Sequence, residues 1–177
     1  MAIADPIPEF SRPPSRTGYA LLVVVPSLPN QQLEGILSKL ASSFPPEDLL
    51  IATQHGSVIS SNPASIADMH PDVVLVGMGG KKGGDEEPIK TIKASPGLMG
   101  FWQTHESFAH PALGADDKNM VANLNPPAGA IAAHAKQMFT VPPDEGHAIH
   151  AEITKDGKIT MTNDRNGFSK TYQGKER

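Results

Sequence analysis

Apolar residues in the front half of the chain fall into three short continuous runs, at 19–25, at 49–52 and at 73–76 within the expected strand 72–76. Continuous rather than alternating apolarity is typical of strands that are covered on both faces, as in a parallel sheet. Between the first two runs, apolar residues from 33 to 44 recur at helical spacing and form one apolar stripe. The front half therefore predicts a strand–helix–strand unit that continues into a third strand.

Boundary residues predict two shorter helices after this unit. A weak helical stretch covers 63–69, and Asp85 is placed to cap a helix that runs through Lys93, with Pro88 tolerated in its first turn. Strands and helices then alternate along the chain, and this order is the signature of a parallel sheet with covering helices.

The back half has a different pattern. Residues 95–125 are mixed, and an Ala-rich helix is expected at 128–139, between two Pro-Pro pairs. An Asp-Gly turn at Asp156 separates two strand-like segments, 149–153 and 159–161, which predicts a hairpin. A last edge strand is expected at 169–172. The buried points expected in the mixed region are Phe101, Trp102, Phe108, Met120 and Val121.

These elements predict an α/β fold, with a parallel-type sheet and covering helices at the front and a C-terminal antiparallel hairpin. Residues 1–17, with four prolines, are expected to be a flexible arm, and residues 18–177 a single domain. The hairpin would leave a free strand edge, and this edge offers a place where an oligomer can form.

Charge and composition narrow the classes of partner. The net charge is −4 and the one basic doublet, Lys81-Lys82, is followed closely by three acids, so no nucleic-acid partner is expected. The apolar run at 19–25 is too short for a membrane span, so no membrane partner is expected either. The chain has no Cys, which removes disulfides and thiolate chemistry. A cytoplasmic location is the default prediction.

A glycine-rich loop follows the third predicted strand, from Gly77 to Gly84. Glycines let backbone N–H groups approach a phosphate, and ligands of open α/β sheets bind beyond the carboxyl ends of strands. The loop fits neither the dinucleotide pattern nor the P-loop pattern, and a solvated surface loop is the alternative. The candidate ligand-binding residues are His55, Gly56, Gly77, Gly79, Lys81 and Lys82.

The histidines suggest a metal site as a second candidate. His105 and His110 are five residues apart, which excludes a helical zincin motif because that motif needs two histidines at i and i+4. A loop could still bring His105, Glu106 and His110 together with His147 or His150 around a divalent metal. Partly exposed loop histidines are the alternative interpretation.

Paired carboxylates at Asp116 and Asp117 have two interpretations as well. They can bind a divalent ion together with nucleotide phosphates, or cap a helix that starts at Lys118, and the cap is favoured. No Gly-x-Ser-x-Gly nucleophile elbow is present, and the sequence identifies no catalytic nucleophile.

Two family resemblances attach to the front half. Val23-Val-Val-Pro26, the following helix and Asp48-Leu-Leu-Ile51 resemble the opening of family-2 glycosyltransferases. Ile51-Ala-Thr-Gln-His-Gly56, with His70-Pro-Asp-Val-Val-Leu-Val-Gly-Met-Gly79, resembles the teichoic-acid type N-acetylmannosaminyltransferases. Both likenesses end before about residue 93. They imply a transferase that acts on a nucleotide-sugar or another small phosphorylated ligand.

Three functional hypotheses follow. The first is this transferase, with its ligand across the His55-Gly56 turn and the glycine loop. The second is a metal-dependent hydrolase or lyase built on the histidines and Glu106. The third is a non-catalytic binding or assembly domain that uses the C-terminal hairpin.

Overall fold

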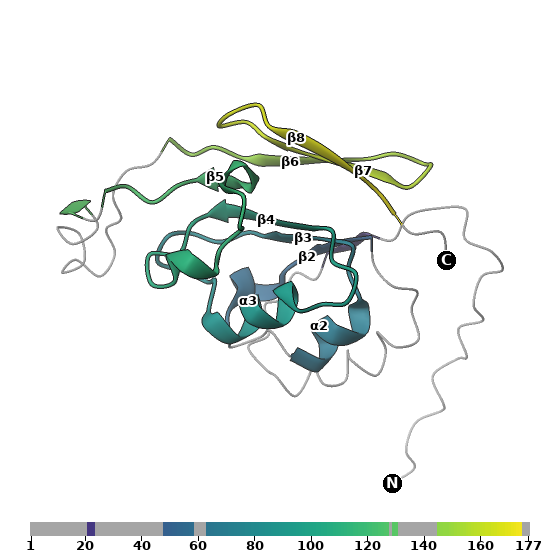
Figure 1. The fold of residues 1–177 in the computed structure, drawn as a ribbon, viewed down its shortest axis with the longest axis horizontal. Helices are drawn as coiled ribbons and strands as arrows, with labels where there is room; N and C mark the ends of the chain where they lie inside the picture. The colour runs from purple at the N-terminus through teal and green to yellow at the C-terminus, as the bar shows by residue number, and fades with distance from the viewer. Residues whose placement is uncertain (1–20, 24–47, 59–62, 128, 131–144, 175–177) are drawn as a thin grey trace, which may run out of the picture.

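The computed structural model describes residues 21–23, 48–58, 63–127, 129–130 and 145–174. The predicted helices at 33–44 and 128–139 and the arm at 1–17 lie outside the described residues, apart from residues 129 and 130. The described part contains eight strands in two sheets, with helices on one side (Figure 1). The α/β fold class is confirmed.

The parallel sheet has five strands in the order β1-β2-β3-β4-β5, and every neighbouring pair is parallel. Its strands are β1 (Leu21–Val23), β2 (Leu49–Ile51), β3 (Val73–Val76), β4 (Gly100–His105) and β5 (Val121–Asn123). The described parts of the connections contain two α-helices, α2 (Pro63–Met69) and α3 (Glu86–Lys93), and three 3-10 turns, η1 (Thr53–Gly56), η2 (Pro111–Leu113) and η3 (Lys118–Met120).

The strand order explains the position of the helices. Crossovers between parallel strands are almost always right-handed, and here each step leads to the next strand in the same direction. All connections are therefore expected on one face of the sheet, and α2 and α3 do lie together on that face (Figure 1). The opposite face needs a different cover.

That cover is an antiparallel sheet in the order β6-β7-β8, with β6 (Ile149–Ile153), β7 (Lys158–Asn163) and β8 (Ser169–Gln173). The predicted hairpin and last edge strand are thus confirmed. Figure 1 shows the resulting three layers, with the parallel sheet between the helices and the antiparallel sheet.

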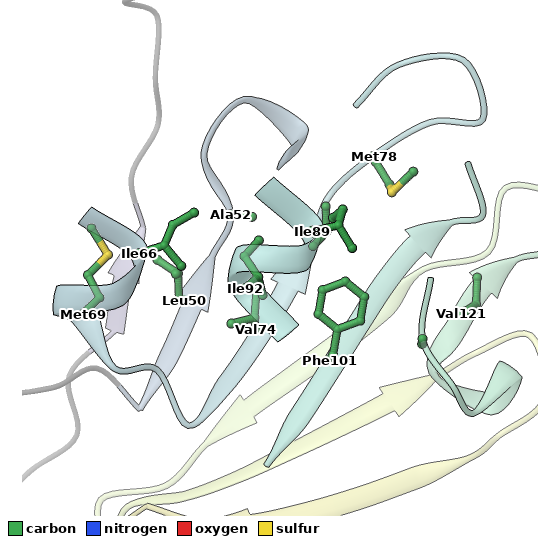
Figure 2. Packing of buried hydrophobic residues seen from close by; sticks show 12 residues of the cluster. Leu50, Ala52, Ile66, Met69, Val74, Met78, Ile89, Ile92, Phe101 and Val121 are labelled. Carbon is green, nitrogen blue, oxygen red and sulfur yellow. The ribbon is translucent and has the colours of Figure 1, made fainter. Parts of the chain in front are cut away.

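Successive residues of the parallel strands enter two separate cores. Leu50 and Val74 pack with the helices, together with Ile89 and Ile92 of α3 (Figure 2). Leu49 and Val73 pack against the antiparallel sheet in a second core. The other buried members of that core are Trp102, Ile159, Met161 and Tyr172. Burial on both faces explains the continuous apolar runs in the sequence.

The mixed region at 95–125 differs from its sequence pattern, because it supplies β4 and β5 and extends the parallel sheet. Phe101, Trp102 and Val121 are buried, as predicted, whereas Phe108 and Met120 are only partly buried. No helix in the described part of the chain is long and apolar enough to cross a membrane.

Candidate functional site

Four segments meet at the carboxyl ends of the parallel strands. η1 follows β2, the glycine loop follows β3, Glu106 follows β4, and Asn125 lies two residues beyond β5. Open parallel sheets bind ligands at this edge. The order β1 to β5 contains no reversal, so the described sheet lacks the crevice that doubly wound folds form where the strand order reverses.

The turn after β2 has an unusual backbone. Gln54 (φ 41°, ψ 45°) and His55 (φ 63°, ψ 21°) both adopt the left-handed conformation. For residues other than glycine this conformation costs about 1–3 kcal/mol each, and it occurs preferentially at functional sites. The surrounding contacts therefore have to hold the turn in place.

Those contacts come from the glycine loop. The backbone N–H of Gly84 donates to the His55 carbonyl (2.8 Å), and that of Asp85 donates to the Gly56 carbonyl (3.0 Å). The His55 Nδ1 atom lies 2.5 Å from the Gly77 carbonyl oxygen. Since a carbonyl can only accept, Nδ1 carries a proton, and in this tautomer Nε2 is the acceptor of the ring.

The glycines of the loop fall into two groups. A Cβ on Gly80 would lie 2.4 Å from the Phe108 ring, and one on Gly83 would lie 2.2 Å from the His55 carbonyl oxygen. Packing therefore requires glycine at these two positions. By contrast, a Cβ on Gly77 or Gly79 would meet no atom within 4 Å, and neither residue has a positive φ.

The charges around the loop are arranged unevenly. Lys81 and Lys82 are exposed on a tight turn that is closed by paired backbone hydrogen bonds between Gly79 and Lys82. The Asp85 carboxylate accepts from Ser57 Oγ (3.1 Å) and from the Val58 N–H (2.9 Å). In the same way, Glu86 pairs with Lys90. Two of the three acids that follow the lysines thus have partners within the protein.

The end of β4 fixes the other side of the loop. Thr104 Oγ1 lies 2.7 Å from both the backbone N–H and the carbonyl of Met78, accepting from one and donating to the other. The N–H of Phe108 donates to the Gly80 carbonyl (2.8 Å). The glycine loop is therefore held by β4 as well as by the His55 turn.

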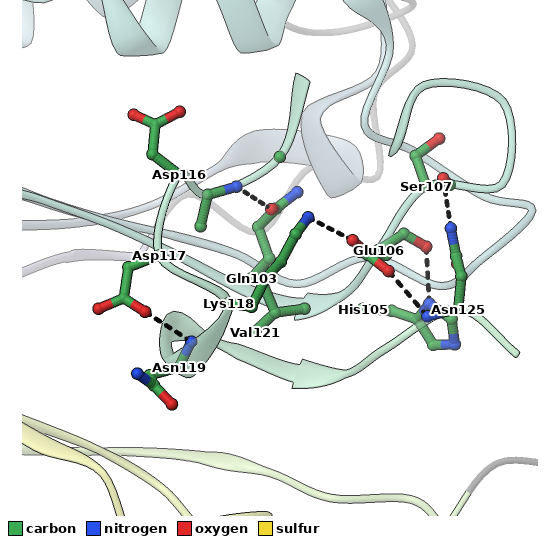
Figure 3. Close-up of polar contacts among 12 residues, drawn as sticks. Gln103, His105, Glu106, Ser107, Asp116, Asp117, Lys118, Asn119, Val121 and Asn125 are labelled. Atoms are coloured by element: carbon green, nitrogen blue, oxygen red, sulfur yellow. Dashed lines mark hydrogen bonds and ion pairs between the residues drawn. The ribbon is translucent and has the colours of Figure 1, made fainter. Parts of the chain in front are cut away.

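Glu106 occupies a polar cluster at the ends of β4 and β5 (Figure 3). One carboxylate oxygen pairs with Lys118, and the other accepts from the Asn125 N–H (2.9 Å). Burial raises the pKa of Glu106, but these hydrogen bonds outweigh it and hold the pKa below its usual range. The carboxylate is therefore ionised and ties the two strand ends together.

The six candidate metal ligands do not converge. Glu106 is held by Lys118, Asp116 pairs with Lys93 (2.8 Å), and Asp117 caps η3 through the Asn119 N–H (2.9 Å). His105 Nδ1 lies 2.7 Å from the Glu106 carbonyl, and His147 lies beside Glu145 (2.7 Å). The pKa of Glu86 is lowered chiefly by its hydrogen bond to Lys90, with a smaller electrostatic contribution from His110. Among the described residues, no group of three or more His, Asp or Glu side chains could hold a metal ion.

The capping alternative for Asp117 is confirmed by this geometry. Asp116 and Asp117 also line an open depression of about 290 Å³ at the amino end of β4, on a floor that includes Phe101 and Met120. Lys93 neutralises Asp116 there and donates to the Gly114 carbonyl (2.9 Å). Asp117 is therefore the one charged side chain of this lining without an oppositely charged partner among the described residues.

Sequence reasoning did not identify Thr104, Asn123 and Asn125, which join the strand ends. Asn123 Nδ2 donates to the Thr104 carbonyl (2.7 Å) and to the His147 carbonyl (2.9 Å). Asn125 Nδ2 donates to the Ser107 carbonyl (3.1 Å), whereas its Oδ1 is buried without a partner among the described residues. These three residues share a position near the end of a strand, where polar side chains are candidates for a site. The sequence could reveal this only if β4 and β5 had been predicted.

Comparison of the chain with models of protein families, with curated proteins and with solved structures finds no match.

Proposed function

We propose that the protein binds a small phosphorylated ligand at the carboxyl ends of β2 and β3, in what we call the glycine-loop site: His55, Gly77, Gly79 and Lys82. The observation that carries the proposal is the strained His55 turn, whose imidazole is oriented by the Gly77 carbonyl beside two glycines with open space above them.

The open space at Gly77 and Gly79 can accommodate a ligand close to the backbone. Neither packing among the described residues nor backbone conformation explains why these positions are glycine. A missing Cβ also lets a ligand approach the backbone closely, which is how glycine loops accommodate phosphates. Lys82 is exposed beside this space and supplies positive charge.

The acids that follow the loop compete with an anion only in part, because two of their carboxylates are bonded within the protein. Asp85 and Glu86 have partners within the protein, Ser57 and Lys90 respectively. Several loop N–H groups are used internally, however, because those of Gly79, Lys82 and Gly84 donate to backbone carbonyls. The ligand is therefore recognised by Lys82 and His55 more than by a ring of free amides.

His55 gives the site its potential chemistry. With Nδ1 donating to a carbonyl, Nε2 can accept a proton from an attacking hydroxyl, which is the role of a general base in group transfer. A transferase acting on a nucleotide-sugar is the first activity to test, because both family resemblances in the sequence imply that class.

The test is thermal unfolding of the full chain with uridine diphosphate, a uridine diphosphate sugar and pyrophosphate, each with and without Mn²⁺. A ligand at about 100 times its Kd stabilises the folded protein by about 2.7 kcal/mol, which corresponds to roughly 5–10 °C for a chain of this size.

Three variants localise the binding. Gly79→Leu fills the open space and should abolish the shift without lowering the Tm of the free protein. Lys82→Ala should weaken it, with Lys155→Ala, an exposed lysine in the β6–β7 turn, as the matched control. His55→Asn keeps a residue that tolerates the left-handed backbone and should affect turnover more than binding. No shift with any of these phosphates, or a shift that survives Gly79→Leu, would contradict the proposal.

A further inference from the structure

The described sheets have three strand edges whose side chains are placed, namely those of β5, β6 and β8. Open edges invite pairing with another chain, and proteins usually block them. At β5, side chains of the antiparallel sheet lie against the strand, because Asn163 Nδ2 (2.9 Å) and Arg165 Nε (3.2 Å) both donate to the Val121 carbonyl. Arg165 Nη2 also donates to the Lys118 carbonyl (2.8 Å), so these side chains cover the strand.

The edge at β8 is blocked in another way. Lys170 is the register partner of Met161, a residue of the second core, so its side chain starts on the inner face of the sheet. Its Nζ lies 5.0 Å from the centroid of the Tyr172 ring. A lysine that points inward on an edge strand is one of the devices that discourage pairing.

β6 carries neither device. Its five residues, Ile149–Ile153, include no proline, glycine, lysine or arginine. Backbone hydrogen bonds join Asp164 N–H to the Ala148 carbonyl and Thr154 N–H to the Lys158 carbonyl. Bonded pairs alternate along an antiparallel ladder, so the even-numbered residues of β6 bond to β7. The backbone groups of Ile149, Ala151 and Ile153 therefore point to the open edge, where the described structure gives them no partner.

The sequence of β6 is chemically symmetric about Ala151. If a second copy pairs antiparallel with Ala151 opposite Ala151, then Ile149 faces Ile153 and His150 faces Glu152, twice each. The isoleucines are half-buried in one chain and would cover each other across the new pair. The His150 side chain is 66% exposed, and its Nε2 lies 3.5 Å from Asp164 Oδ2, which leaves the ring able to bond a carboxylate across the pair.

We propose that the β6 edge is an interface for a second copy of this chain, in which two β6 strands pair about a two-fold axis through Ala151 to form a continuous six-stranded sheet. In such a pair, Ala151 and the isoleucines exchange backbone hydrogen bonds, and His150 and Glu152 form the pairs whose side chains lie closest. Two opposite-charge or hydrogen-bonded pairs then define the register.

The dimer is expected to be weak. Two five-residue strands bury less than the roughly 1,200 Å² of a standard stable interface, so the association belongs to the transient class. Sedimentation equilibrium of the full chain from about 5 µM to about 500 µM should therefore show a monomer that converts to a dimer within this range.

Two proline variants test the edge. Ala151→Pro removes an N–H that points away from β7, and proline is tolerated on edge strands at such positions. Thr171→Pro is the matched control, because the same alternation places its N–H on the open edge of β8. Ala151→Pro should leave a monomer throughout the concentration range, whereas Thr171→Pro should dimerise like the parent chain.

Two charge variants test the register without altering the backbone. His150→Glu places carboxylates opposite each other and should weaken the dimer roughly tenfold. Adding Glu152→Lys restores opposite charges across the pair and should recover the affinity. Circular dichroism and the Tm at low concentration verify that each monomer is folded. A parent chain that stays monomeric, equal effects of both prolines, or no recovery in the double variant would overturn the proposal.

Discussion

The contact between Trp102 and Tyr172 makes the sharpest prediction about stability, because it is a buried side-chain hydrogen bond between the two sheets. The indole Nε1–H donates to the Tyr172 hydroxyl at 2.9 Å. Trp102 is fully buried and Tyr172 is 4% exposed, so water cannot replace either partner. Tyr172→Phe would therefore leave a buried donor unsatisfied.

The magnitude follows from that burial. Leaving one buried polar group without a partner costs about 1–3 kcal/mol, and for a chain of this size each kcal/mol lowers the Tm by about 2–4 °C. Thr171→Val is the matched control. It also removes a hydroxyl that makes one hydrogen bond, to Thr160 (2.9 Å), but Thr171 precedes Tyr172 in β8 and its hydroxyl is exposed to solvent. We expect the control to change the free energy of unfolding by less than about 0.5 kcal/mol.

Urea unfolding gives the measurement, and Trp102 reports it because it is the only tryptophan in the chain. A double-mutant cycle with Trp102→Phe, followed by circular dichroism, isolates the pair, since the double variant removes the donor and the acceptor together. A loss in Tyr172→Phe no larger than in Thr171→Val, or a coupling energy near zero, would refute the reasoning.

Three further predictions test the polar and steric arguments. Burial raises the pKa of Tyr172 above its usual value of 10.0, with Asp117 adding to the effect and the Trp102 hydrogen bond opposing it. The folded protein should therefore lose stability as the pH rises from about 10. Tyr172→Phe should remove this alkaline loss of stability, measured as the Tm against pH. The lowered pKa of Glu106 has the opposite effect on the pH dependence of stability. Its contribution to the free energy of unfolding is present above about pH 4.5 and is lost as the pH falls through the pKa of the folded state. Glu106→Gln should therefore reduce the loss of stability at acid pH. Gly80→Ala brings a Cβ against the Phe108 ring and should cost about 1–3 kcal/mol in urea unfolding, whereas Gly79→Ala, in open space, should be nearly neutral.

The elements that the sequence predicts well are those whose own residues determine them. β2 and β3 are continuous apolar runs because both faces are covered, and Asp156-Gly157 sets the β6–β7 hairpin with Gly157 at φ 80°. α3 ends at Lys93, as expected, although the Asp85 side chain bonds to Ser57 and Val58 and not to the helix. Local signals were sufficient in these places.

β4 and β5 could not be predicted, because tertiary contacts determine them. β4 reads Gly-Phe-Trp-Gln-Thr-His, and four of its six residues are not apolar. Gln103 is nevertheless 1% exposed, since its side chain bonds to the Ala115 N–H (2.7 Å) and to the Met78 sulfur (3.2 Å). Buried polar residues with long-range partners leave no periodic signal, and the candidate site shares this limit because its residues lie at strand ends.

The strand order also shapes the functional proposal. In the described sheet α2 and α3 lie on one face and the strand order does not reverse, so no crevice separates two helical layers and the ligand site has to be built from the loops themselves. This accounts for the dense hydrogen bonding between the His55 turn, the glycine loop and Thr104, which gives loop backbone a fixed shape. It also places the antiparallel sheet on the face that helices leave uncovered. The cover and the ligand site therefore share no residue, and a second copy pairing at β6 would leave the carboxyl ends of β2 and β3 open.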